Sequence, residues 1–212
     1  MHPFPRKGHV EDEGTRIMES KTRREFVVGA GCLVGLVALG GVTRAYASEG
    51  ELLRPPGGQD EERLRALCIK CDRCRSVCPQ HCVEPVSVTE GFLEARTPKL
   101  NFHRGYCDFC DKCIEACPTG ALTAFDPAVD KIGVAVVDTA KCIAFNGRTC
   151  VVCQNSCPYE ALAFDEAGHP VIDEALCNGC GECVMACNVN VNRTFDGTFD
   201  RAIEVRPMEV GA

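Results

Sequence analysis

The chain has 212 residues, of which 18 are cysteine and none is tryptophan, and its formal net charge is −7. Cysteine at about one residue in twelve excludes a plain soluble domain, and disulfide-stapled secreted scaffolds are usually shorter than about 100 residues. The negative charge argues against a nucleic-acid binder that relies on a basic surface.

The N-terminal segment, residues 1–47, reads as an export signal. A basic stretch with the pair Arg23-Arg24 precedes a glycine-rich apolar run over residues 26–42, and an A-x-A triplet ends at Ala47. The arginine pair resembles a twin-arginine signal. The run is short for a transmembrane span, which needs about 20 apolar residues. We therefore expect a twin-arginine signal, with cleavage after Ala47 favoured over retention as an anchor.

Three further features of this segment concern the start of translation, the role of Cys32 and the charge of the mature chain. Residues 1–17 are polar and irregular, so translation is expected to begin at Met18. Cys32 lies in the apolar run and reads as a small apolar passenger. Loss of residues 1–47 leaves 16 basic and 25 acidic residues, a balance of −9. An acidic surface of this kind would suit a basic redox partner.

Residues 48–63 form a lead-in to the rest of the chain. Its stretch Arg54-Pro55-Pro56-Gly57-Gly58 predicts a turn or an extended segment with few core residues. A repeat follows, because cysteine groups begin at positions 68, 107, 142 and 177, at intervals of 39, 35 and 35 residues.

Each repeat carries a motif of four cysteines. Motifs one, two and four are spaced C-x2-C-x2-C-x3-C, whereas motif three has a stretched first gap, C-x7-C-x2-C-x3-C. Proline follows the last cysteine in the first three motifs, and Asn188 stands there in the fourth. The four motifs are, in order, Cys68, Cys71, Cys74 and Cys78; Cys107, Cys110, Cys113 and Cys117; Cys142, Cys150, Cys153 and Cys157; and Cys177, Cys180, Cys183 and Cys187.

The links between motifs predict little regular structure. Each reads as a short strand or helical turn, a reversal and a second short strand, such as residues 134–138 before motif three and 171–173 before motif four. Residues 202–205 read as a delayed final strand. Because no helical periodicity is sustained, the core is expected to be small and to be built around a bound group.

The cysteine spacing is typical of [4Fe–4S] binding. Two-residue gaps present three successive thiolates to one cluster, and the fourth cysteine of such a run ligates the other cluster of a pair. Zinc sites use two C-x2-C pairs set apart by a longer loop, and cysteines two residues apart rarely bridge to each other. We therefore expect four [4Fe–4S] clusters bound by the sixteen motif cysteines, with motif three the least typical.

Two points stay open in this interpretation. The motifs could share clusters consecutively (one with two, three with four) or in a nested way (two with three, one with four), and the link lengths favour the consecutive arrangement. Cys82 follows Cys78 by four residues and belongs to no motif. It reads as a small buried residue, with a spare ligand as the alternative.

From about Leu53 to Pro207 the chain resembles the ferredoxin-type proteins of periplasmic nitrate reductase systems, the NapG/NapF-type polyferredoxins. The residues that carry this resemblance are Arg54-Pro55-Pro56-Gly57, Pro98-Lys99-Leu100-Asn101-Phe102, the stretched gap from Cys142 to Cys150, and the run from Cys177 to Cys183. The stretched gap is the most specific, because generic ferredoxins lack it.

The resemblance implies an α+β fold of tandem bacterial-ferredoxin-like (βαβ-βαβ) modules, over residues 64–138 and 139–212. It implies an exported polyferredoxin that relays electrons between a membrane quinol dehydrogenase or cytochrome and an exported, molybdenum-type reductase. Such a protein would lie in the periplasm or at the outer face of the cytoplasmic membrane, held there through a partner. Other family members are maturation factors that dock on the reductase, which is the alternative function.

An enzyme with its own substrate site is disfavoured. The sequence has no nucleophile–base constellation, no glycine-rich phosphate loop and no metal site without cysteine. The five histidines share no spacing relation, and His81 and His103, which lie near motifs, read as surface residues or neighbours of ligands. The sequence thus favours an electron-transfer protein.

Overall fold

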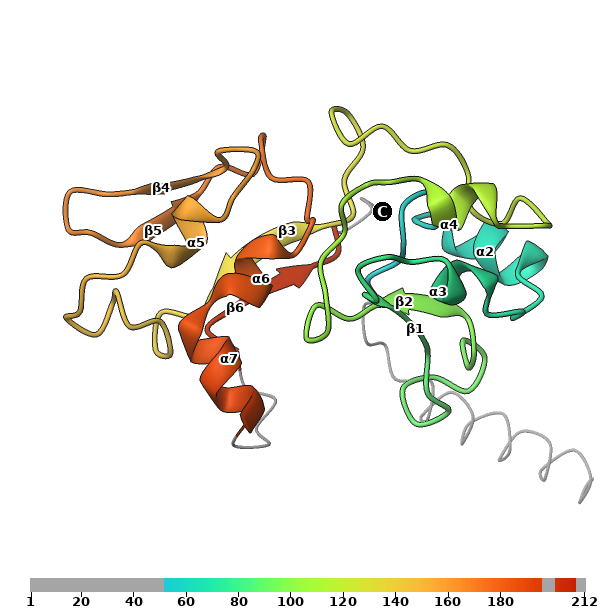
Figure 1. The fold of residues 1–212 in the computed structure, drawn as a ribbon, viewed down its shortest axis with the longest axis horizontal. Coiled ribbons are helices and arrows are strands. Elements are labelled where there is room, and N and C mark those ends of the chain that lie inside the picture. The colour runs from blue at the N-terminus through green and yellow to red at the C-terminus, as the bar shows by residue number, and fades with distance from the viewer. Residues whose placement is uncertain (1–51, 196–200, 209–212) are drawn as a thin grey trace, which may run out of the picture. The chain divides into compact units, whose positions relative to one another are not determined.

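The computed structural model describes residues 52–195 and 201–208 (Figure 1). The chain divides into two compact units, residues 1–45 and 46–212, and all described residues belong to the second. The expected export signal, its cleavage site, Met18 and Cys32 lie outside the described residues. No helix among those described is long and apolar enough to cross a membrane.

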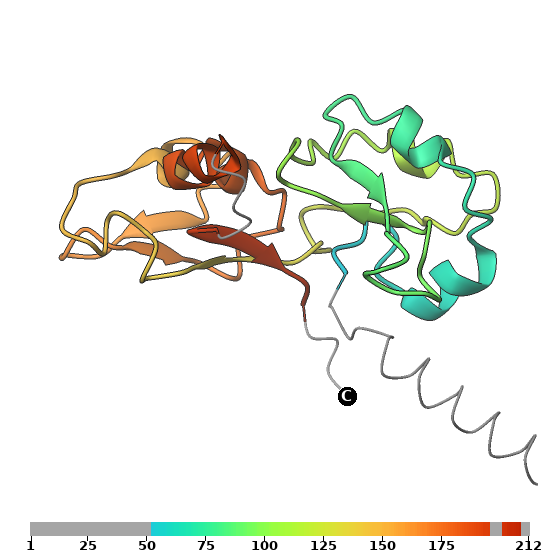
Figure 2. The ribbon, with the colours of Figure 1, turned by 90° about the horizontal axis from the view of Figure 1, so that it is seen from below.

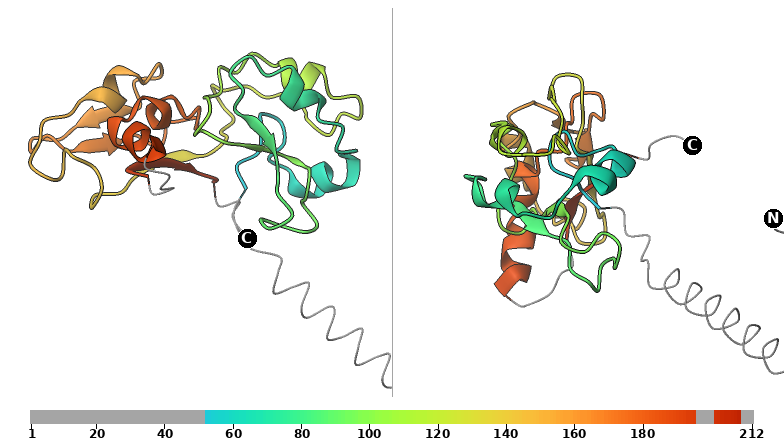
Figure 3. Two further views of the ribbon diagram at one scale, coloured as in Figure 1. Left: turned by 60° about the horizontal axis from the view of Figure 1, so that its bottom comes forward. Right: turned by 90° about the vertical axis from the view of Figure 1, so that its right-hand side faces the viewer.

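The first half contains short helices around one hairpin. Helix α2 (Glu61–Leu67) begins at Asp60, whose carboxylate accepts the backbone N–H of Arg63 at 3.0 Å. Strands β1 (Val83–Pro85) and β2 (Pro98–Leu100) pair antiparallel. The four-residue helices α3 (Arg73–Ser76) and α4 (Lys112–Glu115) lie side by side in motifs one and two (Figure 3).

The second half has strands at both ends of its sequence. Its order is β3 (Val134–Val137), α5 (Val152–Asn155), β4 (Leu162–Phe164), β5 (Pro170–Ile172), α6 (Glu182–Ala186), α7 (Asn188–Phe195) and β6 (Ile203–Arg206). Antiparallel pairing joins β4 to β5 and the first strand, β3, to the last, β6. Helices α5 and α6 lie on one side of these strands (Figure 2). Strand β6 confirms the delayed final strand that the sequence predicted at residues 202–205.

The link between motifs two and three differs from the expected hairpin. Among the described residues, the stretch directly after Pro118 contains no strand, and β3 pairs with β6 instead of folding back on it. Thr123 in this stretch donates its backbone N–H to the carbonyl of Gly57 at 3.0 Å. The lead-in thus provides a backbone hydrogen-bond acceptor that, in a hairpin, a second strand of the same link would have provided.

The lead-in is buried, which corrects the expectation of few core residues. Residues 54–58 are all buried, and Leu53 accepts the N–H of Leu100 at 2.7 Å. Gly57 has φ +76°, and a Cβ there would lie 1.9 Å from the carbonyl oxygen of Thr123. Only glycine allows the two backbones to approach this closely.

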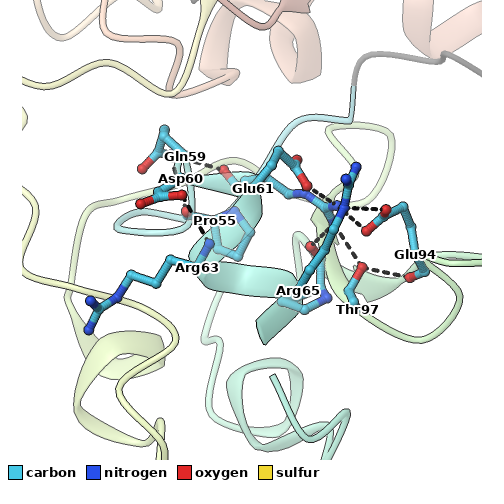
Figure 4. A network of polar contacts seen from close by, with 10 residues as sticks. Pro55, Gln59, Asp60, Glu61, Arg63, Arg65, Glu94 and Thr97 are labelled. Carbon is cyan, nitrogen blue, oxygen red and sulfur yellow. Dashed lines mark hydrogen bonds and ion pairs between the residues drawn. The ribbon is translucent and has the colours of Figure 1, made fainter. Parts of the chain in front are cut away.

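A buried arginine fixes this segment. Arg54 forms a bidentate ion pair with Glu61, at 2.5 and 2.8 Å, and contacts Glu94 at 3.2 Å. Its remaining nitrogen donates to the Thr97 hydroxyl and to the Pro98 carbonyl, both at 2.9 Å. Figure 4 shows Glu61, Glu94 and Thr97 in this network. The guanidinium thus joins the lead-in, α2 and the β1–β2 connection.

The hydrophobic core is small and surrounded by cysteines. One cluster contains only Leu64, Ala121 and Leu122, with Cys68, Cys74, Cys113 and Cys117 packed against it. The larger cluster includes Phe102 and Phe125 and is flanked by cysteines of all four motifs. This agrees with a core built around the motifs.

Candidate metal centres

The motif loops repeat one backbone conformation. In motifs one, two and four, both two-residue gaps contain a residue with positive φ; those residues are Lys70, Asp72, Phe109, Asp111, Gly179 and Gly181. A third such residue follows the last cysteine of motifs one, two and three by three positions, at His81, Gly120 and Glu160. Left-handed residues are uncommon outside glycine, so their recurrence indicates tight loops of one shape that wrap a common kind of object.

Three cavities are each lined by four motif cysteines. The sets are Cys68, Cys71, Cys74 and Cys117; Cys142, Cys150, Cys153 and Cys187; and Cys157, Cys177, Cys180 and Cys183. In each set, three cysteines come from one motif and the fourth comes from the last position of its neighbour. The structure therefore brings together motifs one and two, and motifs three and four, as in the consecutive arrangement.

The remaining motif cysteines are Cys78, Cys107, Cys110 and Cys113, and Cys82 joins them. The Sγ atoms of Cys78 and Cys82 lie 3.7 Å apart. Hydrogen bonding from Cys82, supported by backbone N–H groups, lowers the pKa of Cys78 to about 5. It lowers the pKa of Cys107 as well, while that of Cys82 itself is raised.

Crowded thiols dominate the electrostatics of all the sets. Burial, together with neighbouring thiols, raises the pKa of Cys74 and Cys153 to about 11 and that of Cys113 and Cys180 to about 12. Four buried thiolates would repel one another, so the thiolate form requires positive charge among them. Bound iron supplies that charge, and the donor chemistry of the sets therefore fits an iron–sulfur cluster.

Backbone donors act on the shared cysteines. Burial acts to raise the pKa of Cys117, but the nearby backbone N–H groups of Leu122, Thr119 and Ala121 help to outweigh it, so that the pKa is lowered. Ala135 on β3 donates its N–H to Cys177 Sγ at 3.5 Å. Donors of this kind hold a negatively charged sulfur in a partly buried place.

Zinc is the alternative metal for these cysteines. Within residues 52–195 and 201–208, no group of three or more His, Cys, Asp or Glu side chains is placed to hold a single metal ion. One zinc ion draws all its thiolates to about 2.3 Å from a common centre. A [4Fe–4S] cluster instead takes one thiolate on each of four irons, and the spacing C-x2-C-x2-C-x3-C is typical of it.

Motif three accommodates its long gap in an exposed loop. Residues 146–149 are exposed, and the Asn146 side chain donates to the Cys142 carbonyl at 2.8 Å and to that of Ala140 at 3.2 Å. Val151, at the position equivalent to Asp72, has φ −125°, as expected for a β-branched residue. The loop bulges outward while Cys142 still joins Cys150 and Cys153 around one cavity.

A direct contact joins motifs two and four. The backbone N–H of Cys107 donates to the Cys180 carbonyl at 2.8 Å. Next to it, the Phe109 ring stacks on Phe125 with centroids 5.6 Å apart and meets Tyr159 edge-on at 6.1 Å. Neither contact had a signal in the sequence, since residues far apart in the chain meet only through tertiary packing.

The histidines near the motifs lie at the periphery of the sets. His81 is exposed, and His103 contacts Arg201 through Nδ1. Burial and the Arg201 charge lower the pKa of His103. Neither histidine lines any of the three cysteine cavities described above.

Comparison with known proteins agrees with this geometry. Residues 67–121 match the family described as 4Fe-4S dicluster domain, and residues 169–192 match the 4Fe-4S binding domain. Ferredoxin-type protein NapG of Escherichia coli is 31% identical over 182 residues, which cover 77% of this chain and 78% of the relative. The methylamine utilization ferredoxin-type protein MauM of Methylorubrum extorquens is 31% identical over 213 residues, 91% and 92% of the two chains.

The ferredoxin-type protein NapF of Escherichia coli is 30% identical over 142 residues, 65% of this chain and 81% of the relative. The matched domains and the cysteine motifs together show that the chain binds [4Fe–4S] clusters.

Proposed function

Because this chain belongs to the ferredoxin-type proteins that include NapG, NapF and MauM, we propose that it is an exported polyferredoxin with four [4Fe–4S] clusters. It relays single electrons between a membrane quinol-oxidising partner and an exported reductase. The protein is an electron carrier and supplies no catalytic group of its own. We propose two modules, residues 64–138 and 139–212, that each bind a pair of clusters in the manner of a bacterial ferredoxin, although β3 at the end of the first range pairs with β6 in the second.

One observation carries this proposal: the last cysteine of a motif lies with the first three of its neighbour. That exchange is the ligand pattern of two-cluster ferredoxins. The proposed ligand sets are Cys68, Cys71, Cys74 and Cys117; Cys107, Cys110, Cys113 and Cys78; Cys177, Cys180, Cys183 and Cys157; and Cys142, Cys150, Cys153 and Cys187.

A bound [4Fe–4S] cluster takes up and releases one electron without proton or group transfer. The chain's own contribution is to hold and tune the ligands. Cys180 and Cys183 are buried and most of the other motif cysteines are partly buried. Backbone N–H groups stabilise the shared cysteines, and Cys82 places a thiol beside Cys78. Such contacts set the reduction potential.

The proposed partners follow from the relatives and from the N-terminal sequence. The relatives belong to two contexts by name, since MauM is named for methylamine utilization. The terminal reductase is therefore proposed as an exported redox enzyme, with a molybdenum enzyme as the first candidate. Export follows the twin-arginine route, which carries proteins with clusters already assembled.

Anaerobic purification with iron and sulfide analysis tests the proposal. About sixteen irons per chain are expected from four cubanes, and the reduced protein should return its electrons to a soluble acceptor on mixing. About twelve irons would contradict four clusters. A full complement of iron with no electron exchange, together with a stable complex with the apo-reductase before export, would favour the maturation role instead.

A further inference from the structure

The connection between β1 and β2 is longer than its counterpart and presents apolar side chains to solvent. It spans residues 86–97, whereas the β4–β5 connection spans only residues 165–169. Val88, Phe92 and Leu93 on it are 63%, 64% and 71% exposed. Two adjacent large apolar residues at this exposure are a feature of binding surfaces.

This connection is firmly held, so its exposed residues do not result from a loose loop. The N–H of Val86 donates to the Thr97 carbonyl at 2.8 Å, and that of Arg96 donates to the Val86 carbonyl at 2.9 Å, which closes the connection at its base. Next to Leu93, the buried Glu94 binds Arg54 and also pairs with Arg65 at 2.6 Å. Phe92 and Leu93 are thus presented from a fixed backbone.

The connection lies directly beside motif one. The Lys70 ammonium donates to the Leu93 carbonyl at 3.4 Å, and Arg96 pairs with Asp72 at 3.3 Å. Between the motif cysteines, Ile69 is 63% exposed, and Cys71 is itself exposed. The apolar surface therefore reaches the edge of the set formed by Cys68, Cys71, Cys74 and Cys117.

The same face is basic in a chain whose net charge is −7. Residues 63–75 hold five basic residues and one acidic residue. Arg73 and Arg75 are exposed, and neither forms a salt bridge with any residue that the structure describes. This local charge is opposite to that of the chain as a whole, on which the sequence-based expectation of a basic partner depended.

We propose that the motif-one surface, formed by Ile69, Val88, Phe92, Leu93, Lys70, Arg73, Arg75 and Arg96, docks an acidic redox protein that exchanges electrons at motif one. The inference rests on the proposed function. The apolar residues form the centre of the contact, and the basic residues around it steer an acidic partner and fix its orientation. The exposed edge of the motif-one set then faces the partner.

The experiment measures second-order electron-exchange rates of the iron-loaded protein with an acidic flavodoxin and with a basic cytochrome c, at several ionic strengths. Arg73→Glu/Arg75→Glu is expected to slow exchange with flavodoxin about tenfold or more at low salt and to leave exchange with cytochrome c unchanged or faster. Phe92→Ser/Leu93→Ser should slow flavodoxin exchange at all salt concentrations. Val129→Ser and Arg206→Glu, exposed sites elsewhere, serve as controls and should have no effect.

Several outcomes would overturn the inference. Equal slowing by the control variants, or unchanged rates in both surface variants, would remove the surface from electron exchange. Binding to phosphatidylglycerol vesicles that is lost only in the surface variants, with unchanged flavodoxin rates, would make the surface a membrane contact. Dissociation of a dimer in the same variants would make it a self-association face. Iron content and dithionite reduction test the proposed function separately, and neither should change in these variants.

Discussion

The Sγ atoms of Cys78 and Cys82 lie 3.7 Å apart, within hydrogen-bonding reach of each other. Cys82 is 1% exposed and therefore has no water to bond with. The expected small buried residue is therefore confirmed, and its thiol also lies beside the sulfur of a proposed ligand. When Cys78 is a thiolate, only Cys82 can donate in this contact, so we expect Cys82 to be a hydrogen-bond donor to the set formed by motif two and Cys78.

Replacement of Cys82 by alanine should lower the reduction potential of one centre. A donor to a ligand sulfur stabilises the more negative, reduced state, and a bond worth about 1 kcal/mol corresponds to roughly 40 mV for a one-electron couple. Cys82→Ser keeps a donor and should shift the potential less. EPR-monitored redox titration measures both variants. Loss of iron in both would show that Cys82 is a ligand, and identical potentials would leave it a packing residue.

Cys187→Ser should remove the same centre as Cys150→Ser. Cys187 lines a cavity with Cys142, Cys150 and Cys153, so either substitution takes one ligand from that set. The reduced-state EPR spectrum and the iron content of the two variants should therefore match, and Cys180→Ser should differ from both. A spectrum that matched Cys71→Ser instead would indicate nested sharing between motifs one and four.

Arg54→Ala should destabilise the iron-loaded protein strongly. The substitution leaves the carboxylates of Glu61 and Glu94 without their shared partner, and breaking a buried ion pair costs about 3–5 kcal/mol. Arg65→Ala removes one ion pair to the same Glu94 from a side chain that is 54% exposed, and should cost about 1 kcal/mol or less. Anaerobic thermal unfolding compares the two. Equal midpoints would contradict a special role for the buried guanidinium.

Gly181→Ala and Gly168→Ala separate steric contact from backbone strain. Both glycines have nearly the same φ, +82° and +80°, but a Cβ at Gly181 would lie 2.4 Å from the Phe102 ring, and none of the described atoms lies within 4 Å at Gly168. Gly168→Ala should cost about 1–2 kcal/mol through φ alone. Gly181→Ala should cost more and should also perturb motif four, seen as iron loss or an altered EPR signal. Similar losses of stability and of iron in the two variants would show that the Phe102 ring moves aside without a cost in free energy.

Removal of iron should unfold the region around α2 before the rest. Its hydrophobic cluster has only three buried residues, Leu64, Ala121 and Leu122, and is otherwise completed by four motif cysteines and one partly buried isoleucine, Ile114. Without the bound group, this core is too small to offset the conformational entropy of the chain. Hydrogen exchange after anaerobic chelation should show early loss of protection at the Leu64 amide. Retained protection there would contradict a core that depends on iron.

The metal centres were predictable because their chemistry is local in sequence. Two-residue gaps oblige three thiols to face one object, and the delayed strand at β6 followed from the run Ala202-Ile203-Glu204-Val205. The consecutive arrangement of motifs was favoured by link lengths alone. Its physical basis, Cys117 beside motif one and Cys187 beside motif three, appears only in the packed chain.

The burial of residues 54–58 in the lead-in was not predicted, for a different reason. Arg54-Pro55-Pro56-Gly57-Gly58 has the composition of an exposed turn, and no periodicity marks it as core. It is buried because Arg54 finds two carboxylates, Glu61 and Glu94, the second of them 40 residues away. The hydrogen bond between Cys107 and Cys180 could not be predicted from the sequence either, because its two residues are also far apart in the chain. Local patterns predict local geometry, but they do not reveal which distant backbone groups will meet.

The pairing of β3 with β6 also determines when the second half can fold during synthesis. Helices α2, α3 and α4, the β1–β2 hairpin and the contact between Gly57 and Thr123 need no residue beyond Thr123, although Cys107 still lacks its later partner Cys180. The second half cannot fold until later, because Val134 has no strand partner until Arg206 has been synthesised. Cys187, which joins the first three cysteines of motif three, is synthesised only shortly before Arg206. A nascent chain would therefore carry the elements of the first half before those of the second half can pair. Iron loading of the set that contains Cys187 consequently follows the synthesis of residues up to that cysteine.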